Sequence, residues 1–157
     1  MSAMILHSNT PDVQTVISGS FRKHLQQIFL LRRELEQHNI AVLSPIGSGA
    51  INPQDEFVVL DTDPISHPKV LQDSVFAKIR RSTFLVVANV DGYLGRAAVL
   101  EMGYAIAHGI TIYTLELVED PNLLPYCQPL QSIFPAINYG NLLLNPTTTL
   151  SNILDAI

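Results

Sequence analysis

An almost uninterrupted apolar stretch, TFLVVANV at 83–90, is the feature that most constrains the fold of this 157-residue chain. A strand with one face in water alternates apolar and polar residues, whereas a strand covered on both faces is apolar throughout. The stretch therefore predicts a central strand of a parallel sheet with helices on both sides. A chain of this length buries such a core in one domain without disulfides.

Three segments around this strand predict helices. The first has apolar residues at three- and four-residue steps and ends at Asn39, a residue type that takes the left-handed cap position. The second begins with Pro68, which suits a first helical turn, and the third is followed by Gly109. Their expected ranges are 21–39, 68–81 and 96–108, and a closing helix is expected at 147–157.

The segments between these helices predict the remaining strands. Strands are expected at 14–19, 40–45 and 111–116, with further short strands at 56–61, inside the long 46–66 loop, and at 135–140. Loop and short helix are expected at 117–133, and a loose arm at 1–13. The alternation of strands and helices predicts an α/β fold in one domain, 1–157. The expected architecture is a doubly wound, mainly parallel sheet of four to five strands with helices on both faces, Rossmann- or flavodoxin-like.

Composition narrows the range of partners. Charged residues make up 15%, the formal net charge is −5 and no basic stripe is present, which argues against extended nucleic acid. No apolar run approaches the roughly 20 residues of a membrane helix, so no membrane partner is expected. A single cysteine and the lack of a signal-peptide pattern predict a cytoplasmic location. The apolar fraction of 47% predicts a homodimer or higher homo-oligomer.

The turn after the 14–19 strand is the first candidate binding segment. In doubly wound sheets a ligand binds outside the carboxyl ends of the strands. Gly19 allows close approach of a ligand, Ser20 is suited to cap the helix, and the exposed N–H groups around Phe21 form an anion site to which Arg22 adds charge. The alternative is an ordinary helix cap with solvated basic side chains.

The segment after the central strand is the second candidate. Helical spacing places Glu101 on one face with alanines at 97, 98 and 105, where a ligand has room to approach an acidic group. A solvated surface glutamate is the alternative. The loop before this helix contributes the candidate ligand-binding residues Asn89, Gly92, Tyr93 and Gly95, together with Asp91.

These segments resemble the nucleoside 2-deoxyribosyltransferase-like superfamily over residues 14–116. The resemblance is carried by STFLVVANVD, then GYLGRAAVLEMGYAIAHG, and by TVISGSFRKH with AVLSP further upstream. It implies that Glu101 is a nucleophile that displaces the base from a deoxyribosyl carbon and forms a glycosyl ester, which water or a second base resolves. It also implies that Gly19, Ser20 and the 91–95 loop hold the sugar or its 5′-phosphate.

One departure from the family pattern bears on catalysis. The family often has an Asp near the start of the strand before the loop, which orients the sugar or handles the base proton, and Thr83 stands there in this sequence. Asp91 is the candidate substitute and is predicted as a second catalytic residue.

The leading functional hypothesis is cleavage of an N-glycosidic bond, or deoxyribosyl transfer, on a small-molecule nucleoside or nucleotide. The alternative is a nucleotide-binding sensor or regulatory domain of the same fold without turnover, and a structural interaction domain is a third possibility. No cofactor is expected. No metal is expected either, because no second His or Cys stands at zinc spacing.

Overall fold

A five-stranded parallel sheet forms the centre of the computed structural model, which describes residues 12–47, 49–50, 54, 59–61 and 67–142. The strand order is β2-β1-β3-β4-β5, and every neighbouring pair is parallel. The predicted α/β, doubly wound fold is therefore confirmed. The strands are β1 (Val13–Gly19), β2 (Ile40–Ser44), β3 (Phe84–Ala88), β4 (Ile112–Thr114) and β5 (Cys127–Pro129).

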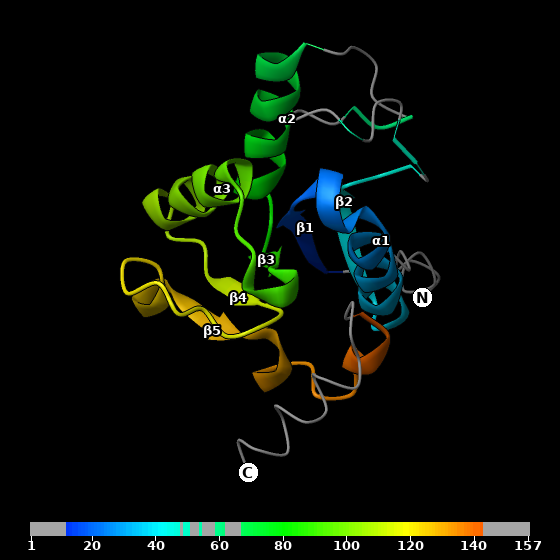
Figure 1. Ribbon diagram of the computed structural model, residues 1–157, viewed down its shortest axis with the longest axis vertical. Coiled ribbons are helices and arrows are strands. Elements are labelled where there is room, and N and C mark those ends of the chain that lie inside the picture. The colour runs from blue at the N-terminus through cyan, green and yellow to red at the C-terminus, as the bar shows by residue number, and fades with distance from the viewer. Residues whose placement is uncertain (1–11, 48, 51–53, 55–58, 62–66, 143–157) are drawn as a thin grey trace, which may run out of the picture.

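Three helices cover the sheet, α1 (Phe21–Gln37) on one face and α2 (Pro68–Arg80) with α3 (Arg96–Ala107) on the other (Figure 1). Successive strand residues point to opposite faces, so each central strand contributes to two cores. Ile17 packs in the core under α1, and Val16 packs in the core under α2 and α3. All five residues of β3 are buried, as the apolar stretch predicts.

Both predicted helix stops are confirmed. Asn39 has φ 62° just beyond the end of α1, and Gly109 has φ 70° beyond the end of α3. These left-handed positions end the helices and send the chain back toward the sheet.

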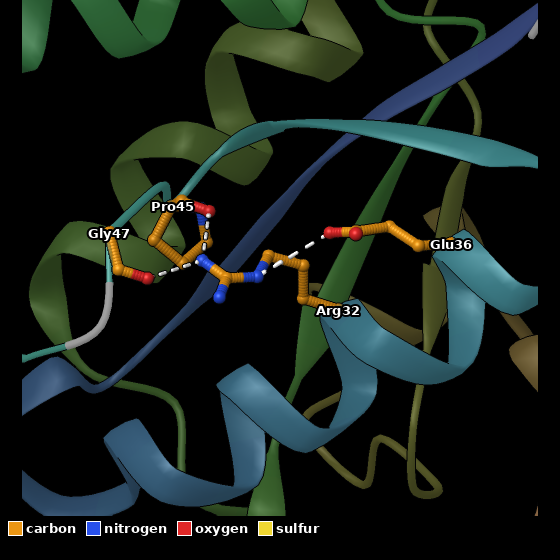
Figure 2. Close-up of polar contacts among 4 residues, drawn as sticks. All are labelled: Arg32, Glu36, Pro45 and Gly47. Carbon is orange, nitrogen blue, oxygen red and sulfur yellow. Dashed lines mark hydrogen bonds and ion pairs between the residues drawn. The ribbon is translucent and has the colours of Figure 1, made fainter.

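Arg32 of α1 forms hydrogen bonds with the segment that follows β2 (Figure 2). Its Nη1 donates hydrogen bonds to the carbonyl oxygens of Pro45, at 3.2 Å, and Gly47, at 2.9 Å. Its Nε also lies 3.5 Å from Oε1 of Glu36, which is half exposed, so the carbonyl contacts contribute more than this ion pair. The start of the loop after β2 is thereby held against α1.

The fifth strand is not where the sequence predicts it. The expected strand at 135–140 is wrong: Tyr139–Leu142 forms a 3₁₀ helix, and β5 lies instead at Cys127–Pro129, within the segment expected to be loop and short helix. The apolar residues of the C-terminal segment are spaced to close one core rather than to alternate across a sheet. Leu130, Ile137 and Leu142 are buried in the core under α1.

Several expected elements fall partly or wholly beyond the described residues. Val13 belongs to β1 rather than to a loose arm, while 1–11 and the expected helix at 147–157 are not described. In the expected strand at 56–61, Leu60 forms an isolated antiparallel bridge with Ala50, and 56–58 are not described. Among the described residues, no helix has the length and apolar character needed to span a membrane.

The strand order creates one position where ligands are favoured. The chain goes from β1 to β2 on one side and from β3 to β4 on the other, so β1 and β3 flank a topological switch point. Gly19 pairs with Ala88 at the last position of this ladder. The turn after β1 and the loop after β3 therefore leave the sheet side by side, as the sequence predicts for its two candidate segments.

Candidate active site

Glu101 of α3 is a buried carboxyl group at this edge of the sheet. Only 8% of the residue is exposed, and it shares the inner face of α3 with Ala98 and Ala105. The small alanine side chains let α3 approach the sheet closely and bring the carboxyl group to the end of β1. The alternative of a solvated surface glutamate is ruled out.

Two neutral donors hold the carboxylate of Glu101, one on each oxygen. Ser18 Oγ, in β1, donates to Oε1 at 2.5 Å, and Gln72 Nε2, in α2, donates to Oε2 at 2.8 Å. Each carboxylate oxygen can accept further hydrogen bonds, so neither contact blocks it completely. Among the described residues, no lysine or arginine forms an ion pair with Glu101.

The pKa of Glu101 reflects these surroundings. Burial raises its pKa above the usual range of carboxyl groups, while the hydrogen bonds from Ser18 and Gln72 act in the opposite direction. A desolvated carboxylate without a paired cation is more basic than a surface carboxylate, while the two donors fix its orientation.

The turn between β1 and α1 has the predicted cap. Ser20 is the N-cap residue, and its Oγ accepts a hydrogen bond from the backbone N–H of Lys23 at 3.1 Å. The N–H of His24 is bonded to the carbonyl of Ser20. The amides of Phe21 and Arg22, at the first two helical positions, lack intrahelical acceptors and give the turn the capacity to bind an anion.

Gly19 is required at this turn for steric reasons. A Cβ atom at this position would lie 3.0 Å from Cδ1 of Ile28 and 3.1 Å from the carbonyl oxygen of Ala88. The missing side chain therefore allows α1 to pack directly above the junction of β1 and β3.

The start of the loop after β3 is fixed by Glu116, which follows β4. The side-chain amide of buried Asn89 donates to the carbonyl of Glu116 at 2.9 Å and accepts from its N–H at 2.8 Å. Asp91 and Gly92 have positive φ, 56° and 76°, and the Asp91 N–H donates to Oε2 of Glu116 at 2.5 Å. Burial raises the pKa of Glu116, while hydrogen bonds from the backbone amides of Asp91 and Gly92 lower it.

The next part of the loop reaches toward α1. The Lys23 ammonium lies 3.8 Å from the centre of the Tyr93 ring, and the His24 ring meets Tyr93 edge-on at 6.1 Å. A Cβ at Gly95 would lie 3.3 Å from Cε1 of Tyr93, so the glycine makes room for this ring. Basic, aromatic and acidic side chains thus surround the first turn of α1.

The structure brings most predicted site residues to one edge of the sheet. Sequence reasoning missed the partners that come from elsewhere in the chain. Gln72 could not be recognised, because the sequence predicts a solvent-exposed side chain for an amide residue in an ordinary amphipathic helix. Glu116 was not identified as a candidate either. Thr83 lies at the opposite, amino end of β3, where its Oγ1 accepts from the N–H of Gln14. The departure at Thr83 therefore lies away from Glu101.

Three further aromatic, basic and thiol side chains outside this edge have structural surroundings. Tyr104 stacks on Phe76 with ring centres 4.5 Å apart, and His108 is the C-cap residue of α3. Burial raises the pKa of the Cys127 thiol, which disfavours the reactive thiolate. Within the described part of the chain, no group of three His, Cys, Asp or Glu side chains is arranged to hold a metal ion.

Comparisons with known proteins give matches only among solved structures. No protein-family model matches the chain, and no curated protein is significantly similar to it. A CMP N-glycosidase (BcmB) from Clostridium botulinum is 12% identical with a TM-score of 0.46, over 92% of this chain and 99% of that one. A conserved protein from Enterococcus faecalis V583 is 13% identical with the same TM-score and the same coverage of both chains. Similarity this low does not define the chemistry of the site, which depends on this chain's own residues.

Replacing Glu101 with Gln is expected to stabilise the fold at high pH. The folded pKa of Glu101 lies above its unfolded value, so wild type loses stability as pH rises from the ordinary carboxyl range through that folded pKa. The amide of Glu101→Gln carries no charge to desolvate. Thermal unfolding measured from pH 4 to pH 9, a range that begins at the ordinary carboxyl pKa, should show the variant gaining over wild type as pH rises. A constant difference across this range would contradict the raised pKa.

Proposed function

We propose that this protein cleaves or transfers the N-glycosidic bond of a nucleoside or nucleotide, with Glu101 as the nucleophile. The supporting observation is the carboxyl group itself, which is buried at the switch point, held on both oxygens by Ser18 and Gln72, and free of any cation among the described residues. Surface carboxylates need no such arrangement, whereas a nucleophile must be held in one rotamer about 3 Å from the carbon that it attacks.

The proposed reaction has two displacement steps. A Glu101 oxygen bonds to the anomeric carbon as the bond from that carbon to the base nitrogen breaks, and the base leaves with the electron pair and takes up a proton. Water, or the nitrogen of a second base, then attacks the same carbon and breaks the ester bond, which restores the carboxylate. Attack by water gives hydrolysis, and attack by a second base gives transfer.

The rest of the ligand extends over the first turn of α1. The free amides of Phe21 and Arg22, with the Arg22 side chain, favour an anionic group such as a 5′-phosphate. Tyr93 offers an aromatic ring, and Gly19, Ser20, Asn89, Gly92 and Gly95 complete the proposed binding residues. Asp91, exposed beside the first turn of α1, is the proposed second catalytic residue that handles the proton of the base or of the attacking water.

The activity is testable with a panel of deoxyribonucleosides, ribonucleosides and their 5′-monophosphates. Wild type is expected to release free base from at least one of them, and a second added base reports transfer. Glu101→Gln should bind the same ligand with similar affinity and lose base release by several orders of magnitude, because the covalent step has no substitute. Equal turnover by both proteins would exclude the nucleophile. Tight binding without turnover by either would favour the sensor alternative.

Gln72 is expected to set the pH at which Glu101 becomes active. Its hydrogen bond favours the ionised carboxylate, so Gln72→Leu should move the acidic limb of the pH–kcat profile upward by about half to one pH unit, the equivalent of one neutral hydrogen bond. KM should change little. Gln26→Leu, which alters an exposed amide of α1, is the matched control. Superimposable profiles for Gln72→Leu and wild type would rule out this role.

The proposal includes a homodimer or higher homo-oligomer with a contact near 91–108. On the outer face of α3, Val99 is 40% exposed and Leu100 is 55% exposed. Both residues, together with Leu94, line a shallow hollow of about 430 Å³. Burial of such side chains favours association. Light scattering at micromolar concentration is expected to show at least a dimer, and Leu100→Glu should shift it toward monomer. A monomeric wild type would contradict this part of the proposal.

A further inference from the structure

His24 occupies a position that the helical pattern reserves for an apolar side chain. The inner face of α1 consists of His24, Ile28, Leu31 and Leu35, and His24 is only 5% exposed. Ile28 lies above Gly19 at the end of β1, and His24 precedes it by four residues, at a kink where the backbone of α1 departs from helical geometry (φ −134°, ψ 28°) beside Tyr93. The imidazole is thus part of the ligand-facing end of α1, on the opposite side of β1 from Glu101.

The ring of His24 has an unsatisfied polar atom. Its Nδ1 is buried and has no hydrogen-bond partner, and among the described residues it is the sole buried side-chain nitrogen or oxygen in this condition. Leaving such an atom unpaired costs free energy, and native proteins rarely keep one without a reason. A leucine at this position would continue the apolar stripe at no such cost. The unpaired nitrogen therefore indicates that the imidazole has a role other than packing.

The groups facing His24 come from two elements. Lys23 lies next to it on α1, and the loop after β3 contributes Asp91 and the edge contact with Tyr93. Burial lowers the pKa of His24, Lys23 acts in the same direction, and the charge of Asp91 opposes them. Burial, the largest of these effects, therefore disfavours the imidazolium in the free protein, and the charge of Asp91 offsets it only in part.

We propose that His24 is a ligand-binding residue that takes up a proton from solvent when the oxyanion of a sugar phosphate binds at the first turn of α1, and then donates a hydrogen bond from its ring to that oxyanion. The proposal rests on the ligand class of the proposed function but not on catalysis. The phosphate adds its negative charge to that of Asp91 beside the ring. The free amides of Phe21 and Arg22 lie at this turn, and the Lys23 ammonium, which lies over the Tyr93 ring, is the neighbouring cation.

Binding and protonation are therefore linked. The ligand raises the pKa of His24 from its lowered value, so protons are taken up on binding in the pH window between the free and the bound pKa. Affinity for the sugar phosphate increases as pH falls through this window. A site of permanently charged arginine and lysine would bind the phosphate without taking up a proton. In the proposed site, binding takes up a proton, and this uptake depends on His24 alone.

The direct test is an NMR titration of the imidazole signals with and without ribose 5-phosphate. The pKa of His24 is expected to rise by about one unit or more with the phosphate. The exposed His38, whose Nδ1 already contacts the carbonyl of Glu34 at 2.8 Å, is the internal control and should not change. Ribose without phosphate should leave His24 unchanged. An unaltered His24 pKa with ribose 5-phosphate, or an equal shift with ribose, would overturn the proposal.

His24→Phe separates a binding role from a structural one. Phenylalanine keeps an aromatic ring against Tyr93 but has no donor, so affinity for ribose 5-phosphate should fall about tenfold, as expected for one charge-assisted hydrogen bond, and its pH dependence should disappear. The melting temperature should be unchanged or higher, because Nδ1 of the replaced ring is buried without a hydrogen-bond partner in the free protein. A lower melting temperature with unchanged affinity would show a structural role and reject the proposal.

The test and the proposed function fail in different ways. Wild type that binds ribose 5-phosphate with proton uptake but releases no base would reject the proposed catalysis and leave the role of His24 intact. Base release that is insensitive to His24→Phe, with no proton uptake on binding, would do the reverse.

Discussion

The parallel pairing of β1 with β3 is the contact on which the rest of the site depends. Its register places Gly19 opposite Ala88, and the two chains leave the sheet at this level to form the turn before α1 and the loop before α3. Glu101, Ser18, Asn89 and His24 come from four different segments of the chain, and this ladder brings those segments to one edge of the sheet. Because all five residues of β3 are buried and β1 is largely buried, the ladder is protected from water and holds these positions firmly.

The central part of the fold follows from the sequence for simple reasons. Helix periodicity, the caps at Asn39 and Gly109 and the continuous apolar run of β3 are local signals, and the structure confirms all of them. The fifth strand could not be found in this way. Cys127–Pro129 is short, contains a proline and has no alternating pattern, so its pairing with β4 depends on neighbours rather than on its own residues.

The candidate site likewise contains some residues that the sequence reveals and others that only the structure reveals. Glu101 and the loop after β3 stand out in the sequence because glycines, alanines and an acidic residue occur together. Their supporting partners do not, since Gln72 and Glu116 are polar residues in unremarkable surroundings and become informative only when their hydrogen bonds are seen. His24 was hidden for a further reason, because only the burial of its face of α1 distinguishes it from a solvated residue.

The alternation of β1 has a consequence for how this chain tolerates changes in length. Ser18 and Gly19 are adjacent, yet Ser18 lies on the side of Glu101, while Gly19 lies under Ile28 of α1. Deleting or inserting a single residue in β1 would exchange the two sides of the strand, withdrawing the hydroxyl from the carboxylate and forcing a side chain against α1. The contact with Glu101 and the packing of α1 on the end of β1 would be lost together. Among natural homologues, β1 should therefore keep its length even where surface loops differ in theirs.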